Sequence, residues 1–215
     1  MSKMFIVVGA GSMNGSFLYV PSGATVIAAD GGLRHLKKVG VQPSLIIGDF
    51  DSLGYVPSSS NVISAPSEKD ETDTMIAVKQ ALSLGADTIV IYGGLGGRFD
   101  HSIANLQTLK FIAENGARGY LVGDGTIVTA FMNGGICFDE NISGFVSVFA
   151  VGGMARGVAL RGLKYPLTNA SLSNANPVGV SNEFIGIPSS VYVGKGCLLV
   201  TWNGESFIPA KYGII

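Results

Sequence analysis

The stretch Leu45-Ile46-Ile47-Gly48-Asp49-Phe50-Asp51-Ser52 carries the pattern on which the predicted fold depends. Its first three residues form an apolar run of the kind found in buried strands, and a glycine and two acids follow directly. In extended backbone, Asp49 and Asp51 would point the same way, about 7 Å apart. Two carboxylates at that distance raise each other's proton affinity unless a cation lies between them. Because Mg²⁺ commonly binds one or two carboxylates together with substrate phosphates, the pair is a candidate magnesium site; the alternative is a solvated acidic turn.

Up to about Asp124, short apolar runs alternate with helical patterns. The runs predicted as strands are Met4–Val8, Thr25–Ala29, Leu45–Ile47, Val62–Ser64, Thr88–Tyr92 and Tyr120–Val122. Helices are predicted at Leu33–Val39, at 73–82 between the caps Thr72 and Gly85, and at Ser102–Asn115. Uniformly apolar strands separated by amphipathic helices are typical of a mostly parallel sheet flanked by helices.

From about Thr126 the pattern changes. Apolar runs at Phe145–Ala150, Val191–Val193 and Cys197–Trp202 are separated by glycine turns, and no helical period is found. This pattern favours a small antiparallel β-sandwich or barrel. The predicted fold is therefore α/β plus all-β, with an α/β domain at 1–125 and an antiparallel β-sandwich at 126–215.

Three of the predicted parallel strands end in acids or glycines: Asp30-Gly31-Gly32, Gly48-Asp49 and Gly93-Gly94. Open parallel sheets bind ligands outside the carboxyl ends of their strands. We therefore expect these segments to line one shared pocket.

A second acidic segment, Glu68-Lys69-Asp70-Glu71-Thr72-Asp73, precedes the second predicted helix. Acids in a first helical turn stabilise the helix dipole, and that ordinary role is one interpretation. If the pocket at the strand ends exists, Asp73 would instead join Asp49 and Asp51 as a third oxygen ligand, and Lys69 would meet phosphate.

The segment Gly93-Gly94-Leu95-Gly96-Gly97-Arg98-Phe99-Asp100-His101 links a strand to a helix. Its glycines allow the backbone to approach an anion closely, and the guanidinium of Arg98 suits phosphate oxygens. A glycine-rich turn without a ligand is the alternative. Asp100 is a candidate helix-start acid, metal ligand or general base, whereas His101 is predicted to be structural.

Composition argues against several classes of function. The chain has 215 residues, of which 47% are apolar and 13% charged, and its formal net charge of −1 argues against nucleic-acid and membrane partners. Cys137 and Cys197 fit no metal or redox spacing, so reduced thiols in a cytoplasmic protein are expected. Glycines interrupt the uncharged stretch between Lys3 and Asp30, and we expect no targeting or membrane segment there. The dinucleotide fingerprint, the P-loop and the protein-kinase signatures are absent.

Taken together, these motifs resemble those of the thiamine pyrophosphokinase family, in the same order and over nearly the whole chain. The matching segments are Ala29-Asp30-Gly31-Gly32, Gly48-Asp49-Phe50-Asp51-Ser52, Lys69-Asp70-Glu71-Thr72-Asp73, Gly93-Gly94-Leu95-Gly96-Gly97-Arg98-Phe99-Asp100-His101, Gly162-Leu163-Lys164-Tyr165-Pro166-Leu167 and Val180-Ser181-Asn182-Glu183. Each motif is weak alone, and the specificity comes from finding six in sequence.

The resemblance implies an enzyme that transfers the pyrophosphoryl group of ATP to the hydroxyl of thiamine and releases AMP. It also implies that the α/β domain is catalytic and that the β-sandwich binds thiamine, in a homodimer whose thiamine site lies near the subunit interface. The same resemblance makes Asp49, Asp51 and Asp73 the Mg²⁺ ligands, and Asp51, Asp73, Arg98 and Asp100 the catalytic residues. The residues implied around ATP are Asp30, Gly31, Gly32, Lys69, Asp70, Thr72, Gly94, Gly96, Gly97 and Arg98. Those implied at the thiamine pyrimidine are Ser181 and Asn182.

One position departs from the family pattern. The aromatic residue that family members often place against thiamine would align with Val200, and the only tryptophan, Trp202, lies two positions further on. Trp202 is therefore either a substrate contact or a core residue. The competing functions are a pyrophosphokinase acting on a pterin-type alcohol, a metal-dependent phosphatase with a nucleophilic aspartate, and a sensor that has lost activity.

Overall fold

The computed structural model describes residues 3–13, 18–51, 54–55, 57, 61–64, 70–204, 207 and 212–214. The chain divides into two compact units, Met1–Gly125 and Thr126–Ile215. Each unit contains its own set of buried apolar side chains. No helix within the described ranges is long and apolar enough to cross a membrane.

The first unit contains a parallel sheet of order β6-β5-β1-β2-β3-β4. Its strands are β1 (Met4–Val8), β2 (Thr25–Ala29), β3 (Leu45–Gly48), β4 (Val62–Ser64), β5 (Thr88–Tyr92) and β6 (Arg118–Gly123). The central strands are buried on both faces, which explains why their sequences are uniformly apolar. The predicted α/β fold with a mostly parallel sheet is confirmed.

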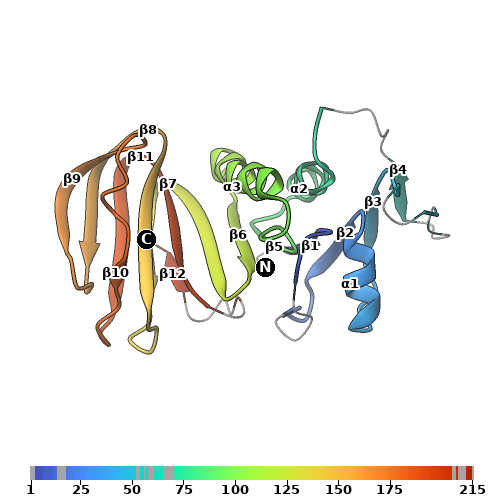
Figure 1. Cartoon of the computed structure of the whole chain (residues 1–215), viewed down its shortest axis with the longest axis horizontal. Helices are drawn as coiled ribbons and strands as arrows, with labels where there is room; N and C mark the ends of the chain where they lie inside the picture. The colour runs from blue at the N-terminus through green and yellow to red at the C-terminus, as the bar shows by residue number, and fades with distance from the viewer. Residues whose placement is uncertain are drawn as a thin grey trace. The chain divides into compact units, whose positions relative to one another are not determined.

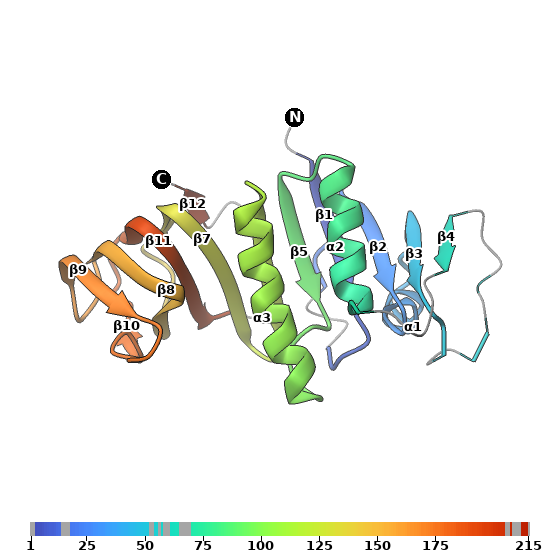
Figure 2. The same cartoon turned by 90° about the horizontal axis from the view of Figure 1, so that it is seen from above.

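Among the described residues, this sheet is covered by the helices α1 (Gly32–Lys38), α2 (Asp73–Ser83) and α3 (Phe99–Glu114). Figures 1 and 2 show α2 and α3 on one face and α1 on the other. The predicted caps of α2 are present, because the Thr72 hydroxyl accepts a hydrogen bond from the Met75 amide at 3.2 Å and Gly85 follows the helix with φ 82°.

The strand order reverses beside β1. From β1 the chain proceeds outward through β2, β3 and β4, and it then returns to place β5 on the other side of β1. In open parallel sheets, ligands bind at the carboxyl ends of the two strands where the order reverses. The topology therefore points to the loops that follow β1 and β5.

The second unit is antiparallel throughout its described pairings, as predicted. Its elements are β7 (Thr126–Phe138), β8 (Phe145–Arg161), β9 (Leu167–Ser173), β10 (Asn182–Glu183), β11 (Ser189–Asn203) and β12 (Tyr212–Ile214). The order is β10-β8-β11-β7, with β9 paired to β8 and β12 to β7. The sequence predicted several short runs here, whereas β7, β8 and β11 are long, because glycines that were read as turns lie inside continuous strands.

Trp202 belongs to the core of the second unit. Its side chain is 2% exposed and makes edge-on contacts with Phe138 and Tyr212, at ring-centroid distances of 5.2 and 5.1 Å. Its indole N–H donates a hydrogen bond to the Tyr212 hydroxyl at 3.3 Å. Of the two roles predicted for Trp202, the structure supports the core role, while Val200 is itself fully buried.

Candidate active site

The carboxyl ends of β1 and β5 are joined directly through their backbones. The Gly9 amide donates to the Tyr92 carbonyl at 2.8 Å, and the Gly11 amide donates to the Gly93 carbonyl at 2.9 Å. On the other side of β1, the Asp30 amide donates to the Ile47 carbonyl at 2.7 Å. The acid- and glycine-containing strand ends predicted to converge therefore lie along one edge of the sheet.

Two of the predicted glycines are required by close backbone approach. A Cβ atom on Gly32 would lie 1.8 Å from the Val8 carbonyl oxygen, and one on Gly93 would lie 2.5 Å from the Gly9 oxygen. Only glycine permits these distances, because real Cβ contacts are longer. The turn after β2 and the loop after β5 can therefore pack against the end of β1.

The remaining predicted glycines of the loop after β5 have different surroundings. The Gly94 carbonyl accepts a hydrogen bond from the buried Asn105 amide at 2.8 Å, which ties the loop to α3. Gly96 lies against the carboxylate of Asp124. Gly97 has φ 68° and open space around its Cα atom, which leaves this part of the loop accessible to an anion.

The sequence analysis assigned no role in the site to Gly9 and Gly11, which follow β1. The structure places them beside Gly93 at the reversal of strand order. His35 of α1 also contacts this loop, with its Nε2 atom 2.9 Å from the Gly11 carbonyl oxygen. The sequence feature that could have indicated this role is the pair of glycines that follows the buried strand Met4–Val8.

Asp30 has the most unusual surroundings among the predicted acids. Its backbone is left-handed, with φ 46°, and its buried Oδ1 atom has no hydrogen-bond partner among the described residues. A buried carboxylate oxygen without a partner is costly, and in a native protein it calls for a specific explanation. A cation or a hydrogen-bond donor from a ligand would satisfy it.

A turn, and not strand alternation, places Asp49 and Asp51. β3 ends at Gly48, and Phe50 adopts φ 62° with its ring only 2% exposed. The Asp51 amide donates to the Asp49 carboxylate at 3.1 Å. The expectation of a shared extended backbone was therefore wrong, because the residue between the two acids adopts left-handed backbone. Asp51 remains exposed.

The other predicted acids lie at or before the first turn of α2. Asp73 is the first residue of the helix, Thr72 is its N-cap, and Asp70 lies exposed just before it. Lys69 falls outside the described residues. Within the described ranges, no three His, Cys, Asp or Glu side chains lie close enough together to hold a metal ion. The structure therefore does not bring Asp49, Asp51 and Asp73 into one ready-made cluster.

The residue types nevertheless suit Mg²⁺. Mg²⁺ prefers carboxylate oxygens, takes only one or two from the protein in many nucleotide sites, and completes its shell with water and phosphate. The unpartnered buried oxygen of Asp30 lies at the same sheet edge. A magnesium–nucleotide complex therefore fits the chemistry of these side chains, although the protein alone does not assemble a three-acid site.

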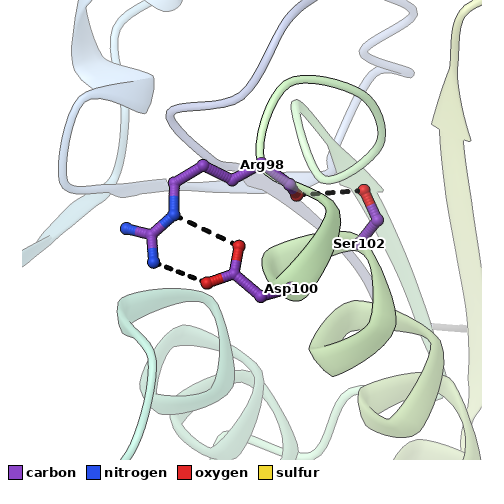
Figure 3. A network of polar contacts seen from close by, with 3 residues as sticks. All are labelled: Arg98, Asp100 and Ser102. Carbon is purple, nitrogen blue, oxygen red and sulfur yellow. Dashed lines mark hydrogen bonds and ion pairs between the residues drawn. The ribbon is translucent and has the colours of Figure 1, made fainter.

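Arg98 and Asp100 form an exposed ion pair at the start of α3 (Figure 3). Two hydrogen bonds join them, from Nε to Oδ1 at 3.2 Å and from Nη2 to Oδ2 at 2.6 Å. The hydrogen bond to Arg98 lowers the pKa of Asp100, and the same bond raises the pKa of Arg98. Arg98 is the N-cap residue of α3, and its carbonyl oxygen accepts a hydrogen bond from the Ser102 hydroxyl at 3.4 Å.

The two C-terminal motifs contact each other. The Asn182 side chain is 4% exposed; its amide donates to the Tyr165 carbonyl at 2.7 Å, and its oxygen accepts from the Tyr165 amide at 2.9 Å. Lys164 forms an ion pair with Glu183 at 2.7 Å. Ser181 is exposed, with φ 60°, and its amide donates to the Ser147 hydroxyl at 3.0 Å. Asn182 therefore holds the Tyr165 turn in place, while Ser181 is exposed to solvent.

The fold and the site place the chain in a class of two-unit proteins. The first unit is α/β, with acids and glycines where the strand order reverses, and the second unit is antiparallel. The family models that match describe the thiamin pyrophosphokinase catalytic domain, at residues 18–121, and its vitamin B1 binding domain, at residues 136–198. The chain belongs to the thiamine pyrophosphokinase family.

Individual relatives agree with this assignment. The thiamine pyrophosphokinase of Bacillus subtilis is 30% identical over 182 residues, which cover 81% of this chain and 85% of the relative. A crystal structure of that name from the same species superposes with a TM-score of 0.84 at 24% identity, covering 94% of this chain and 99% of the other. The thiamin pyrophosphokinase of Geobacillus thermodenitrificans gives a TM-score of 0.80 at 26% identity, covering 94% and 97%.

Proposed function

We propose that the chain transfers the pyrophosphoryl group of ATP to the hydroxyl of thiamine, giving thiamine diphosphate and AMP. Family membership supports the overall reaction. The structural observation that carries the proposal is the gathering of acids and glycines at the reversal of strand order, where a parallel sheet binds its ligand.

The nucleotide is proposed to lie along this edge of the first unit. Gly94, Gly96 and Gly97 would bring backbone amides to its phosphates, with the start of α3 adding a favourable dipole. Arg98 would bind the transferred group through its planar guanidinium. The other residues proposed around ATP are Asp30, Gly31, Gly32, Lys69, Asp70 and Thr72.

The ion pair of Arg98 with Asp100 gives these two residues a linked role. Paired with Arg98, Asp100 has a lowered pKa and is a weak base. When the guanidinium turns to phosphate, that hydrogen bond is lost and the pKa of Asp100 rises toward its usual range. Asp100 then becomes a better acceptor for the proton of the attacking hydroxyl, at the moment when the phosphates are in place.

Asp49, Asp51 and Asp73 are proposed to hold Mg²⁺ with the nucleotide. When bound, the ion would supply positive charge against the phosphate oxygens. Asp51 is exposed at the turn after β3 and can reach an incoming complex, while Asp73 sits at the first turn of α2.

In the second unit, Ser181 is the residue proposed to contact thiamine. Its exposed position leaves the hydroxyl accessible, and Asn182 supports it by holding Tyr165. Asn182 would thus have two roles: it would keep this segment in the conformation that binds thiamine, and it would contact the thiamine pyrimidine directly. We also propose that the chain works as a homodimer in the cytoplasm.

The test is incubation with ATP, Mg²⁺ and thiamine, with thiamine diphosphate, AMP, ADP and free phosphate measured separately. The proposal expects thiamine diphosphate and AMP in equal amounts. A pterin alcohol in place of thiamine tests the nearest alternative acceptor. Release of free phosphate together with ADP and without AMP would instead indicate the phosphatase, and ADP without free phosphate would indicate transfer of a single phosphoryl group to the acceptor.

A further inference from the structure

Asp124 places another carboxylate at the same edge of the sheet. It follows directly after β6, the neighbour of β5, and lies within the first unit. A Cβ atom on Gly96 would lie 2.5 Å from Oδ2 of Asp124. The carboxylate therefore lies close to the backbone of the loop after β5.

The surroundings connect Asp124 with both glycine loops. A Cβ atom on Gly96 would also lie 3.7 Å from Cβ of Ser12, in the loop after β1. A Cβ atom on Gly123 would lie 3.3 Å from Cβ of Leu95. The carboxyl ends of β1, β5 and β6 thus meet around Gly96, and Asp124 contributes the negative charge there.

The carboxylate of Asp124 is exposed, and it has no hydrogen bond or ion pair to another residue in the described part of the chain. A carboxylate only accepts hydrogen bonds, and it repels phosphate oxygens. The part of a bound nucleotide beside Asp124 should therefore carry neutral hydrogen-bond donors. In ATP the donors nearest the phosphates are the ribose hydroxyls.

We propose that Asp124 is a specificity residue that accepts hydrogen bonds from the ribose hydroxyls of ATP. This inference rests on the proposed function, because it takes ATP as the ligand of this sheet edge. A carboxylate in contact with a vicinal diol can accept from one or both hydroxyls, so Asp124 would select ribonucleotides over deoxyribonucleotides.

A purely structural role for Asp124 makes a different prediction. Asp124 and Gly125 have φ 49° and 70°, and aspartate is common at such left-handed turn positions. Glycine and asparagine adopt this backbone at least as readily. The variants Asp124→Gly and Asp124→Asn therefore keep the turn, while the first removes the side chain and the second removes only its charge.

The experiment measures binding of ATP, 2′-deoxy-ATP and 3′-deoxy-ATP to the full chain by calorimetry, with Mg²⁺ and without thiamine. We expect the unaltered chain to bind ATP about 10- to 100-fold more tightly than at least one deoxy analogue, the range for a hydrogen bond to a charged group. Asp124→Gly should bind all three nucleotides with similar affinity, close to that of the weaker analogue. Asp124→Asn, which keeps an acceptor oxygen, should fall between them.

The inference would be overturned if the preference for ATP persisted in Asp124→Gly. It would also be overturned if the unaltered chain bound all three nucleotides equally. A third contradicting result would be a KM in Asp124→Asn that rises for thiamine and not for ATP. That result would mean that the carboxylate contacts the thiazolium cation of thiamine. Because the binding measurement needs no turnover, it remains informative even if no thiamine diphosphate is made, and that failure would count against the proposed reaction alone.

Discussion

At the scale of single residues, Phe50 is buried and the residue after it, Asp51, is exposed. The left-handed backbone of Phe50 puts its ring into the core, and the next residue is left exposed beside Asp49. Since the proposed chemistry consists mainly of positioning and charge stabilisation, Asp51 should matter for rate and little for stability.

We therefore expect Asp51→Asn to lower kcat at least about 100-fold, the scale of losing one electrostatic stabiliser. Glu114→Gln, an exposed change on α3, is the matched control and should retain full activity. Steady-state AMP formation at saturating Mg²⁺ measures both. Near-normal activity in a folded Asp51→Asn protein would remove Asp51 from the site.

Tyr212 gives a second residue-scale prediction, about pH. Burial raises the pKa of the Tyr212 hydroxyl, with the hydrogen bond from Trp202 acting in the opposite direction. Because the folded chain holds this proton more tightly than the unfolded chain, its contribution is complete below about pH 10 and is lost as the pH rises through the folded pKa.

The free energy of unfolding should therefore fall more steeply above about pH 10 in the unaltered chain than in Tyr212→Phe. Urea unfolding followed by Trp202 fluorescence at several pH values measures the difference. Parallel pH curves for the two proteins would show that Tyr212 ionises equally in the folded and unfolded states.

At the scale of secondary-structure elements, α1 can pack at the end of β1 only because residue 32 is glycine. A Cβ atom there would meet the Val8 backbone oxygen at 1.8 Å, and backbone cannot move aside as a side chain can. Gly40, just after α1, offers a contrast, since it has φ 71° but open space around it.

We expect Gly32→Ala to destabilise the chain by at least about 3 kcal/mol, the upper end of the range for overpacking. Gly40→Ala should cost about 1–2 kcal/mol, the penalty of left-handed backbone alone. Denaturant unfolding of both variants provides the comparison. Equal losses would mean that the β1–α1 contact relaxes easily.

Element lengths in the second unit show where sequence reasoning stopped. Gly152, Gly153 and Gly157 have positive φ angles inside β8, and the register of β11 shifts between Val193 and Cys197. Glycine marks both a turn and a bulge within a continuous strand, so the sequence pattern alone cannot separate the two. β8 and β11 are single strands because the residues before and after each irregularity pair with the same neighbouring strand.

At the scale of the whole molecule, the two units carry different spectroscopic signals. The described helices all lie in the first unit, whereas Trp202, the only tryptophan, is buried in the second. Circular dichroism at the helical band and tryptophan fluorescence therefore report on different cores.

Because each unit has its own core, we expect the two signals to give different urea midpoints. Adding ATP with Mg²⁺ should raise the midpoint of the circular dichroism transition more than that of the fluorescence transition, since a ligand stabilises the unit that binds it. Coincident transitions that shift equally would show that the chain unfolds as a single cooperative unit.

The sequence by itself determined the parallel sheet, the antiparallel second half and the acids and glycines at the strand ends, because burial on two faces, helical periodicity and strand ends are local properties of the chain. Only the tertiary structure decided which of these segments are neighbours. In the first unit, the Gly11 amide bonds to the Gly93 carbonyl, and Asp124 lies beside Gly96. In the second unit, the Asn182 side chain bonds to Tyr165, and Trp202 is buried in the core. Such contacts join residues far apart in sequence, and they depend on strand order and on the space left by each side chain, which no local pattern encodes.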